Sequence, residues 1–169
     1  MTKYVALLRA VNVGGTGKLP MTELKSMCES SGFLNARTYI ASGNVVFESK
    51  LAEAAVKAKL ERCMATYAGK PVDVLVRTGP EMAAVLAANP FKSRAANATV
   101  AIFLDERPPK GALKTITGQA EEEVALGTRE IYVHYGAGMG RSKLKIPAAK
   151  KGTARNMNTV AKLAEWASG

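Results

Sequence analysis

Cysteine and histidine are scarce in this sequence of 169 residues. Cys28 and Cys63 are its two cysteines, and His134 is its one histidine. Zinc sites need several such ligands close together, and a nucleophilic cysteine needs a histidine partner. The composition therefore excludes the usual zinc clusters and Cys–His catalysis. We expect no metal, and we expect His134 to lie on the face of a strand.

Long apolar runs are also missing. A membrane span needs about 20 consecutive apolar residues, and no segment of the chain approaches that length. From Met1 the chain runs directly into a strand-like segment, without the apolar region or cleavage site of a signal peptide. We therefore expect a cytoplasmic protein. Each cysteine lies on the apolar stripe of a predicted helix, so we expect buried, reduced thiols rather than a disulfide.

Acidic residues are outnumbered. The chain has 24 Lys and Arg against 14 Asp and Glu, a formal net charge of +10. Such a charge attracts nucleic acid, phosphorylated small molecules or acidic surfaces, although it also merely keeps some proteins soluble. No acidic residue lies between Glu130 and Glu165, and we favour anion binding there over a solvated face. The basic residues of this interval are Arg141, Lys143, Lys145, Lys150, Lys151, Arg155 and Lys162.

Aromatic residues make up only 6% of the chain. A sheet that binds RNA by stacking bases needs aromatic side chains on its central strands. Tyr39 and Phe47 are the candidates for such a role, but packing in the core or in a hairpin is the commoner use of aromatic residues. The acidic run 121–123 lies beside a turn, and we expect it to be solvated.

Hydrophobic spacing predicts a strand, a helix, a hairpin, a helix and a strand over residues 1–79. The elements are a strand around Val5 and Leu7, a helix from Pro20 to Gly32, strands at 38–40 and 45–47, a helix over 56–67 and a strand at 72–76. This βαββαβ order is that of the ferredoxin-like, or split βαβ, unit.

Residues 80–169 predict a second, less regular copy. Its elements are a short helix from Pro80, a strand at 99–104, a helix around Leu113 and Ile116, strands at 124–126 and 130–135, and a helix over 153–167. A final strand is not evident, unless Leu144 and Ile146 supply it. We therefore expect an α+β fold of two ferredoxin-like halves with antiparallel sheets, 1–79 and 80–169, the second ending in the basic segment.

A glycine-rich loop, 12–18, joins the first predicted strand to the first predicted helix, as phosphate-binding loops do. It is not a nucleotide-hydrolysing P-loop, because Asn12 stands where that motif needs glycine and Leu19 where it needs a Ser or Thr for magnesium. Two alternatives remain. The flanking Arg9 and Lys18 favour a general anion-binding loop, and the glycines by themselves are compatible with a flexible connection.

A second glycine-rich loop, 135–143, follows a predicted strand. A dinucleotide-binding fingerprint needs a third glycine where Arg141 stands, so a Rossmann site and its cofactor are not supported. The loop ends in Arg141, Ser142 and Lys143, which are donors of the kind that hold phosphate. We expect no cofactor.

Thr153, Arg155 and Asn156 are typical of a helix start. Free backbone N–H groups and the positive end of the helix dipole would add to an anion site there. Simple capping of the helix by Thr153 is the alternative.

Five segments together resemble one bacterial family. They are LRAVNVGG (8–15), LPM (19–21), TYIASGNVVF (38–47), GRSKL (140–144) and TARNMNTV (153–160). The sequence is similar to the family of domain of unknown function 1697, over essentially the whole chain. The resemblance implies two ferredoxin-like halves and no established activity. The chain departs from the family at Ala10, commonly glycine, and at Met157, commonly tryptophan.

The motifs of the family coincide with the loops chosen above, and together they predict one ligand site. Its residues are Arg9, Asn12, Lys18, Ser42, Asn44, Arg141, Ser142, Lys143, Arg155 and Asn156. Our leading hypothesis is a non-catalytic binder of nucleic acid or another phosphate-bearing ligand. The first alternative is an enzyme acting on a phosphorylated metabolite, with Glu23 or Asp73 as base. The second is a module that self-associates through open sheet edges.

Overall fold

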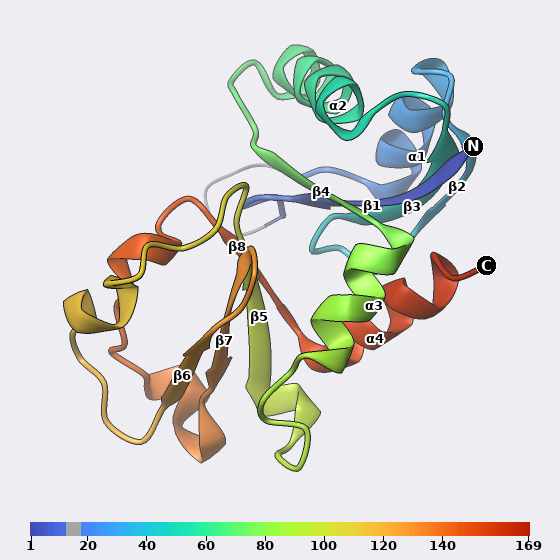
Figure 1. Cartoon of the computed structure of the whole chain (residues 1–169). Helices are drawn as coiled ribbons and strands as arrows, with labels where there is room; N and C mark the ends of the chain where they lie inside the picture. The colour runs from blue at the N-terminus through green and yellow to red at the C-terminus, as the bar shows by residue number, and fades with distance from the viewer. Residues whose placement is uncertain (13–17) are drawn as a thin grey trace. The chain divides into compact units, whose positions relative to one another are not determined.

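The computed structural model describes residues 1–12 and 18–169, so the glycines of the first predicted loop, within 13–17, lie outside the described residues. The chain divides into two compact units. The first comprises Met1–Ala83 and Leu163–Gly169, and the second comprises Ala84–Lys162. The described residues form an α+β fold with two four-stranded antiparallel sheets and four α-helices (Figure 1).

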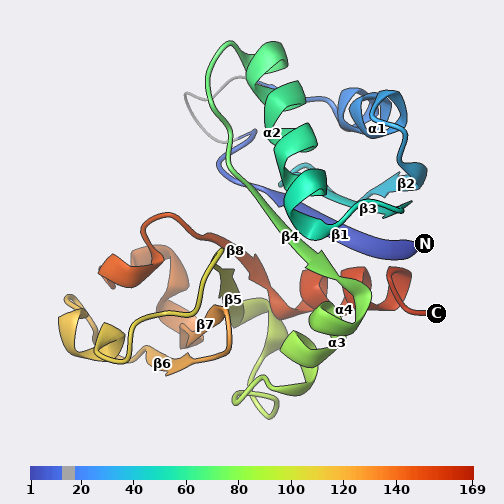
Figure 2. The same ribbon diagram turned by 45° about the horizontal axis from the view of Figure 1, so that its top comes forward.

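The sheet of the first unit has the strand order β2-β3-β1-β4. Helices α1 and α2 lie on the same face of this sheet, as Figures 1 and 2 show from two directions. Their apolar stripes and that face of the sheet form one core. The elements are β1 (Thr2–Leu8), α1 (Met21–Ser30), β2 (Leu34–Thr38), β3 (Asn44–Ser49), α2 (Glu53–Ala68) and β4 (Val74–Thr78).

Strand β1 is buried on both faces, which explains its continuous apolar run. Tyr4, Ala6 and Leu8 belong to the core under the helices, while Val5 and Leu7 are buried on the opposite face. Successive side chains of a strand point to opposite faces, so a doubly covered strand needs apolar residues at every position.

The last residues of the chain pack against the edge strand β2. Trp166 ends helix α4 (Met157–Trp166), and its ring lies 3.7 Å from the guanidinium carbon of Arg37. The ring of Tyr39 meets it edge-on, with the two centroids 5.4 Å apart. These contacts, a cation–π pair and an aromatic pair, hold the end of the helix to the first unit.

The sheet of the second unit has the order β6-β7-β5-β8, so each sheet places its strands, counted along the chain, in the order second, third, first and fourth. One face carries Val100, Ile102 and Val133, and residues 144–149 cover it where the first unit has two helices. The elements are α3 (Gly79–Ala87), which spans the boundary of the units, β5 (Thr99–Phe103), β6 (Glu123–Leu126), β7 (Glu130–His134) and β8 (Thr153–Asn156), with 3-10 turns η1 (Ala96–Ala98), η2 (Ala112–Thr115), η3 (Gly136–Arg141) and η4 (Pro147–Ala149).

Two predicted helices of the second unit are wrong in type or extent. Residues 153–156, expected to begin the last helix, instead form strand β8, because they hydrogen-bond along β5 from Val100 to Phe103. The helix expected around Leu113 and Ile116 is only the single 3-10 turn η2. Pro108 and Pro109 precede it, and the chain returns to extended backbone at Ile116, which leaves no room for an α-helix.

The remaining expectations concern isolated residues. Leu144 and Ile146 do not form a strand, although Lys145 between them makes one isolated bridge with Thr117. His134 ends β7, where its Nδ1 lies 2.9 Å from the Thr99 hydroxyl. Of the two free thiols, Cys28 is buried and Cys63 only half-buried. Among the helices of the described residues, none combines the length and apolar character required to cross a bilayer.

Candidate functional site

Two loops of the second unit are joined backbone to backbone. Thr117 and Lys145 exchange two hydrogen bonds, with N···O distances of 3.0 and 2.8 Å. Next to this bridge, Gly118 has a φ of +71°, and a Cβ placed on it would lie 2.0 Å from the carbonyl oxygen of Lys143. Only glycine combines this backbone conformation with so close an approach. The loop after η2 and the loop after η3 therefore meet at a fixed distance.

Glu122 fastens the same two loops through its side chain. One carboxylate oxygen accepts a hydrogen bond from the Ala120 N–H at 2.6 Å, and the other accepts a short hydrogen bond from the Ser142 hydroxyl. The Ser142 oxygen in turn accepts from the Leu144 N–H at 3.2 Å. These hydrogen bonds, above all the one from Ser142, lower the pKa of Glu122, so the carboxylate is ionised at neutral pH. The expected solvated run at 121–123 is thus wrong for Glu122, which is buried.

These loops line an open cavity of about 450 Å³, here called the Arg141 cavity. Its volume is that of a site for a small molecule. It is lined by Gly118, Ala120, Glu121, Glu122, Tyr135, Ala137, Gly138, Arg141, Ser142 and Lys143.

Arg141 and Lys143 are exposed cations at the lining of this cavity. Within the described part of the chain, neither of them pairs with a carboxylate, whereas Arg94 of the same unit lies 2.7 Å from Glu123. An unpaired guanidinium and an unpaired ammonium on one cavity wall can both donate charge-assisted hydrogen bonds to an anion.

Tyr135 belongs to the same lining. Its backbone N–H donates to the Ala98 carbonyl at 2.8 Å, which fixes the point where β7 ends. Gly136, with a φ of +66°, then turns the chain into η3. Burial, and to a lesser extent the charge of Glu122, raise the pKa of Tyr135, so its hydroxyl stays protonated and able to donate.

In the first unit, Asn12 closes the glycine-rich loop instead of pointing into free space. Its side-chain amide donates to the carbonyls of Leu19 at 2.8 Å and Ala41 at 2.7 Å, and its oxygen accepts from the Leu19 N–H at 2.5 Å. The residue holds a φ of +55°, which asparagine tolerates better than most residues. Asn12 therefore brings two family motifs, 8–15 and 38–47, into contact. The hydrogen bonds of Asn12 with Leu19 and Ala41 are here called the Asn12 clip. The exposed Lys18 directly precedes Leu19 in the chain.

Ser42 and Asn44 shape the hairpin between β2 and β3. Asn44 is fully buried, and its amide donates to the Tyr39 carbonyl and to the Ser42 hydroxyl, both at 2.8 Å. Gly43 between them has a φ of +89°, and a Cβ there would lie 2.6 Å from the Val11 side chain. The hydrogen bonds of the Asn44 amide with Tyr39 and Ser42 therefore stabilise the turn itself.

Arg155 and Asn156 lie at the junction of β8 and α4 and do not line the Arg141 cavity. Arg155 is buried, and its guanidinium donates to the Thr153 hydroxyl at 2.7 Å and to the Ala154 carbonyl at 2.9 Å. Burial lowers its pKa to about 10. Asn156 accepts a hydrogen bond from the Thr159 N–H at 2.9 Å, so the cap of the last helix is Asn156 and not Thr153.

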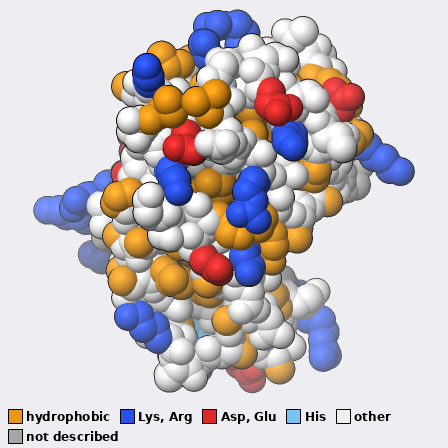
Figure 3. All heavy atoms as spheres, turned by 90° about the vertical axis from the view of Figure 1, so that its right-hand side faces the viewer, with side chains coloured by type: hydrophobic (Ala, Val, Ile, Leu, Met, Phe, Trp, Pro, Cys, Tyr) orange, Lys and Arg blue, Asp and Glu red, His pale blue; other side chains and the backbone are white. Residues whose placement is uncertain are grey.

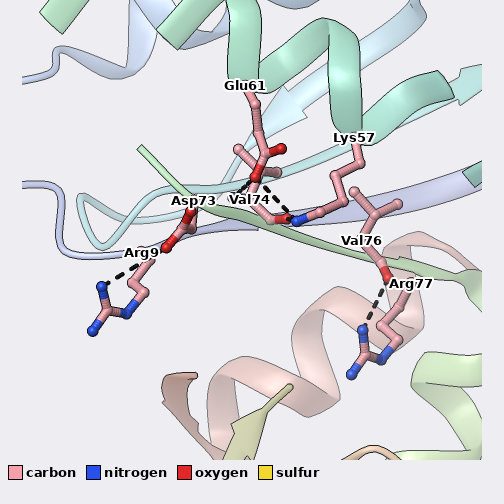
Figure 4. A network of polar contacts seen from close by, with 7 residues as sticks. All are labelled: Arg9, Lys57, Glu61, Asp73, Val74, Val76 and Arg77. Atoms are coloured by element: carbon pink, nitrogen blue, oxygen red, sulfur yellow. Dashed lines mark hydrogen bonds and ion pairs between the residues drawn. The ribbon is translucent and has the colours of Figure 1, made fainter. Parts of the chain in front are cut away.

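Two ion pairs of the first unit lie near the start of strand β4 (Figure 4). Arg9 lies 3.9 Å from the Asp73 carboxylate, just before the strand begins. Lys57 of α2 donates to Glu61 at 3.0 Å, and Glu61 accepts from the Val74 N–H at 3.1 Å, which ties the helix to the strand.

Arg77, in the same strand, is a residue that sequence reasoning missed. It is only 1% exposed, and its guanidinium donates to the Val76 carbonyl at 3.0 Å (Figure 4). Glu122 and Tyr135 were missed as well. A signal for Arg77 was available, namely a charge directly after the apolar run 74–76. Nothing local marks Glu122, whose partner Ser142 lies 20 residues further on.

The ten predicted residues thus fall into three groups. Arg141, Ser142 and Lys143 line one cavity of the second unit, while Arg155 and Asn156 stand apart at the start of α4. The other five belong to the first unit: Asn12, Lys18, Ser42 and Asn44 lie around the Asn12 clip and the hairpin turn, and Arg9 lies beside Asp73. In the portion of the chain that the structure describes, no group of three His, Cys, Asp or Glu side chains could hold a metal ion.

Comparison with known proteins gives a fold and no activity. The sequence profile of a family described as a protein of unknown function (DUF1697) matches residues 1–132. The structure is similar to that of a conserved bacterial protein from Streptococcus pneumoniae, with a TM-score of 0.80 and 23% sequence identity over 99% of each chain. At this identity the likeness shows the fold alone. No curated protein matches the sequence.

Proposed function

Because the chain belongs to the DUF1697 family, whose function is unknown, we propose its function from the site itself: the protein binds a small phosphate-bearing ligand in the Arg141 cavity, without catalysis. The observation that carries this proposal is the pair of cations on the cavity wall. Arg141 and Lys143 have no carboxylate partner among the described residues. A phosphate group could accept two hydrogen bonds from the Arg141 fork and one from Lys143.

The cavity offers neutral donors beside these charges. Tyr135 is one of the lining residues, and its hydroxyl stays protonated because burial raises its pKa. The Ser142 hydroxyl already donates its hydrogen bond to Glu122, so its role is to hold the loop between the two cations in place. Because Ser142 lies between Arg141 and Lys143, its hydrogen bonds hold the backbone that carries both cations.

A small ligand fits these observations better than nucleic acid. Reading of bases would need free amide groups, but those of Asn12 and Asn44 donate to the protein itself, and the side-chain oxygen of Asn156 accepts from the Thr159 N–H. Arg155, a candidate contact to phosphate, is buried. On the face drawn in Figure 3, Lys and Arg side chains are spread among apolar and uncharged atoms and form no continuous stripe.

Nucleic acid remains a second candidate, favoured by the net charge of +10. Its test is fluorescence anisotropy of labelled single-stranded RNA and DNA titrated at several salt concentrations. Binding through phosphates would weaken with salt, with a log–log slope of about −0.7 for each phosphate contacted. Binding that is tight at low salt and lost in Arg141→Ala would place the nucleic acid at the Arg141 cavity.

Catalysis is not part of the proposal, because the two carboxylates considered as bases do not line the Arg141 cavity. Glu23 lies in the first turn of α1, and Asp73 lies 3.9 Å from Arg9. Of the two carboxylates that do line the cavity, Glu122 accepts hydrogen bonds with both oxygens, and Glu121 is exposed and makes no hydrogen bond with a described residue that would orient it as a base.

We also propose that each half is of the ferredoxin-like type. The support in the first unit is the element order β1-α1-β2-β3-α2-β4 with the sheet order β2-β3-β1-β4. The support in the second is the equivalent sheet order β6-β7-β5-β8. There, 3-10 turns and loops replace the two crossover helices.

The ligand proposal is tested by thermal unfolding in the presence of phosphorylated compounds and of their unphosphorylated counterparts. A ligand at 100 times its Kd stabilises the folded state by about 2.7 kcal/mol, which corresponds to a rise in Tm of about 5–10 °C. Arg141→Ala and Lys143→Ala should each abolish most of the rise. Arg107→Ala and Lys110→Ala, exposed residues of the same unit outside the cavity lining, are the matched controls. If no phosphorylated compound, inorganic phosphate included, shifts the Tm at millimolar concentration, the proposal fails.

A further inference from the structure

The lining of the Arg141 cavity carries charges of both signs. Arg141 and Lys143 come from the loop after η3, and Glu121 and Glu122 come from the segment before β6. The acid-free interval of the sequence, 131–164, therefore does not make an acid-free site. The fold brings two carboxylates from an earlier segment to the two cations.

The two carboxylates differ in what they can still bind. Glu122 is buried, and both of its oxygens accept hydrogen bonds from Ala120 and Ser142. Glu121 is exposed, and among the described residues it takes part in no hydrogen bond or ion pair. The carboxylate of Glu121 is therefore open to a ligand, just as the two cations are.

From this arrangement we infer that the ligand is dipolar and carries a positively charged amine as well as a phosphate. This inference rests on the proposed function of the cavity and names the class of its ligand. The phosphate lies against Arg141 and Lys143, and the amine lies towards Glu121. The lining also includes Ala120 and Ala137, whose small side chains leave room for the carbon skeleton of such a ligand.

The carboxylate of Glu121 should also make the cavity selective for phosphate compounds that carry an amine over those that do not. A ligand with a phosphate and no amine leaves its negative charge near the exposed carboxylate of Glu121 with no positive charge to offset it, and like charges disfavour binding. An ammonium group turns the same contact into an attraction. Exposed charge pairs change affinity by about fivefold at most, so the preference we expect is about threefold to fivefold for Glu121.

The experiment is isothermal titration of the whole protein with two matched pairs of compounds. The pairs are glucosamine 6-phosphate with glucose 6-phosphate, and O-phosphoethanolamine with glycerol 1-phosphate; inorganic phosphate is the common reference. We expect the amine-bearing member to bind about threefold to fivefold more tightly in at least one pair. In Glu121→Gln that preference should disappear, through weaker binding of the amine-bearing compound. In Glu106→Gln, an exposed acid outside the cavity lining, it should persist.

The outcomes separate the two proposals. Equal affinity of both members in each pair, lost in Arg141→Ala, would overturn the dipolar ligand and leave phosphate binding in place. A preference for the amine that survives in Glu121→Gln would also overturn this inference, because another group would then be its source. The absence of binding by all five compounds would overturn the proposed function, and the inference with it.

Discussion

The hydroxyl of Ser142 donates a short hydrogen bond to the carboxylate of Glu122, although the two residues lie 20 positions apart in the chain. This contact joins the segment before β6 to the loop after η3, beside the backbone bridge of Thr117 and Lys145. The two loops that line the Arg141 cavity are thus held by side chains as well as by backbone. Substitutions can test these contacts between the two loops and the structural roles of other motif residues.

The Ser142–Glu122 contact should make stability depend on pH. Its hydrogen bonds lower the pKa of Glu122 in the folded state below the ordinary value of 4.5. The carboxylate then contributes stability above about pH 4.5, and this contribution is lost as the pH falls through the lower folded pKa. Ser142→Ala should lower the Tm at pH 7. The difference from the unmodified protein should shrink below pH 4.

The measurement is the Tm of both proteins at steps from pH 7 to pH 3. Ser93→Ala, an exposed serine outside the cavity lining, is the matched control and should show no pH-dependent difference. A Ser142→Ala difference that stays constant down to pH 3 would mean that the hydroxyl acts independently of the charge of Glu122.

Asn12→Ala should destabilise the first unit, because it removes the two donors and one acceptor that clip Leu19 and Ala41. Three hydrogen bonds with a net value of about 1 kcal/mol each predict a loss of roughly 2–3 kcal/mol in the free energy of unfolding. Asn12→Gly loses the same bonds but accepts the φ of +55° more readily. It should therefore be more stable than Asn12→Ala by about 1 kcal/mol.

Urea unfolding monitored by circular dichroism measures both variants. A loss below about 0.5 kcal/mol for Asn12→Ala would show that water replaces the clip, and would return Asn12 to the set of residues free to bind a ligand.

Gly118→Ala should separate the two loops of the Arg141 cavity. Its Cβ would lie 2.0 Å from the Lys143 carbonyl oxygen, and its φ of +71° costs a non-glycine residue about 1–2 kcal/mol. We expect a loss of more than 2 kcal/mol in the free energy of unfolding, or a displaced loop and weaker ligand binding. Gly140→Ala is the control, because nothing lies within 4 Å of its added Cβ. Equal stability and binding in the two variants would contradict the described join.

Arg155→Ala should affect folding rather than binding. The side chain is buried, and its guanidinium is held by the Thr153 hydroxyl and the Ala154 carbonyl. Removing it leaves a cavity and unpaired acceptors at the start of α4, which predicts a loss of roughly 2–3 kcal/mol. Ligand affinity, measured on the folded protein below its transition, should change less than twofold. A variant that folds normally but no longer binds would make Arg155 a contact residue.

Local patterns were sufficient to predict the elements of the first unit. The helix over 56–67 follows from Val56, Leu60 and Met64, which recur at helical spacing and are all buried in α2. The hairpin follows from two β-rich runs around Gly43, but its first strand is displaced: β2 spans Leu34–Thr38 and shares only Thr38 with the predicted strand at 38–40. In these segments the residues that determine the secondary structure are close together in the chain, so their spacing predicts it without knowledge of the tertiary structure.

Strand β8 shows where local patterns are insufficient. Residues 153–156 form a strand because they pair with β5, more than 45 residues earlier in the chain, and Asn156 then caps the helix. A four-residue segment has too weak a preference of its own to resist such pairing. The same reason explains the second unit in general, where loops and 3-10 turns cover the sheet instead of helices with a readable period.

For the site, the sequence by itself determined the basic loop 141–143 and the glycines that let the chain turn before it. Only the tertiary structure decided which carboxylates face that loop, because Glu121 and Glu122 reach it through the bridge of Thr117 and Lys145. It also decided that Asn12, Asn44 and Asn156 bind the protein's own backbone. Residue type and spacing show which groups can bind an anion, but the partners of those groups come from distant segments, and folding alone brings them together.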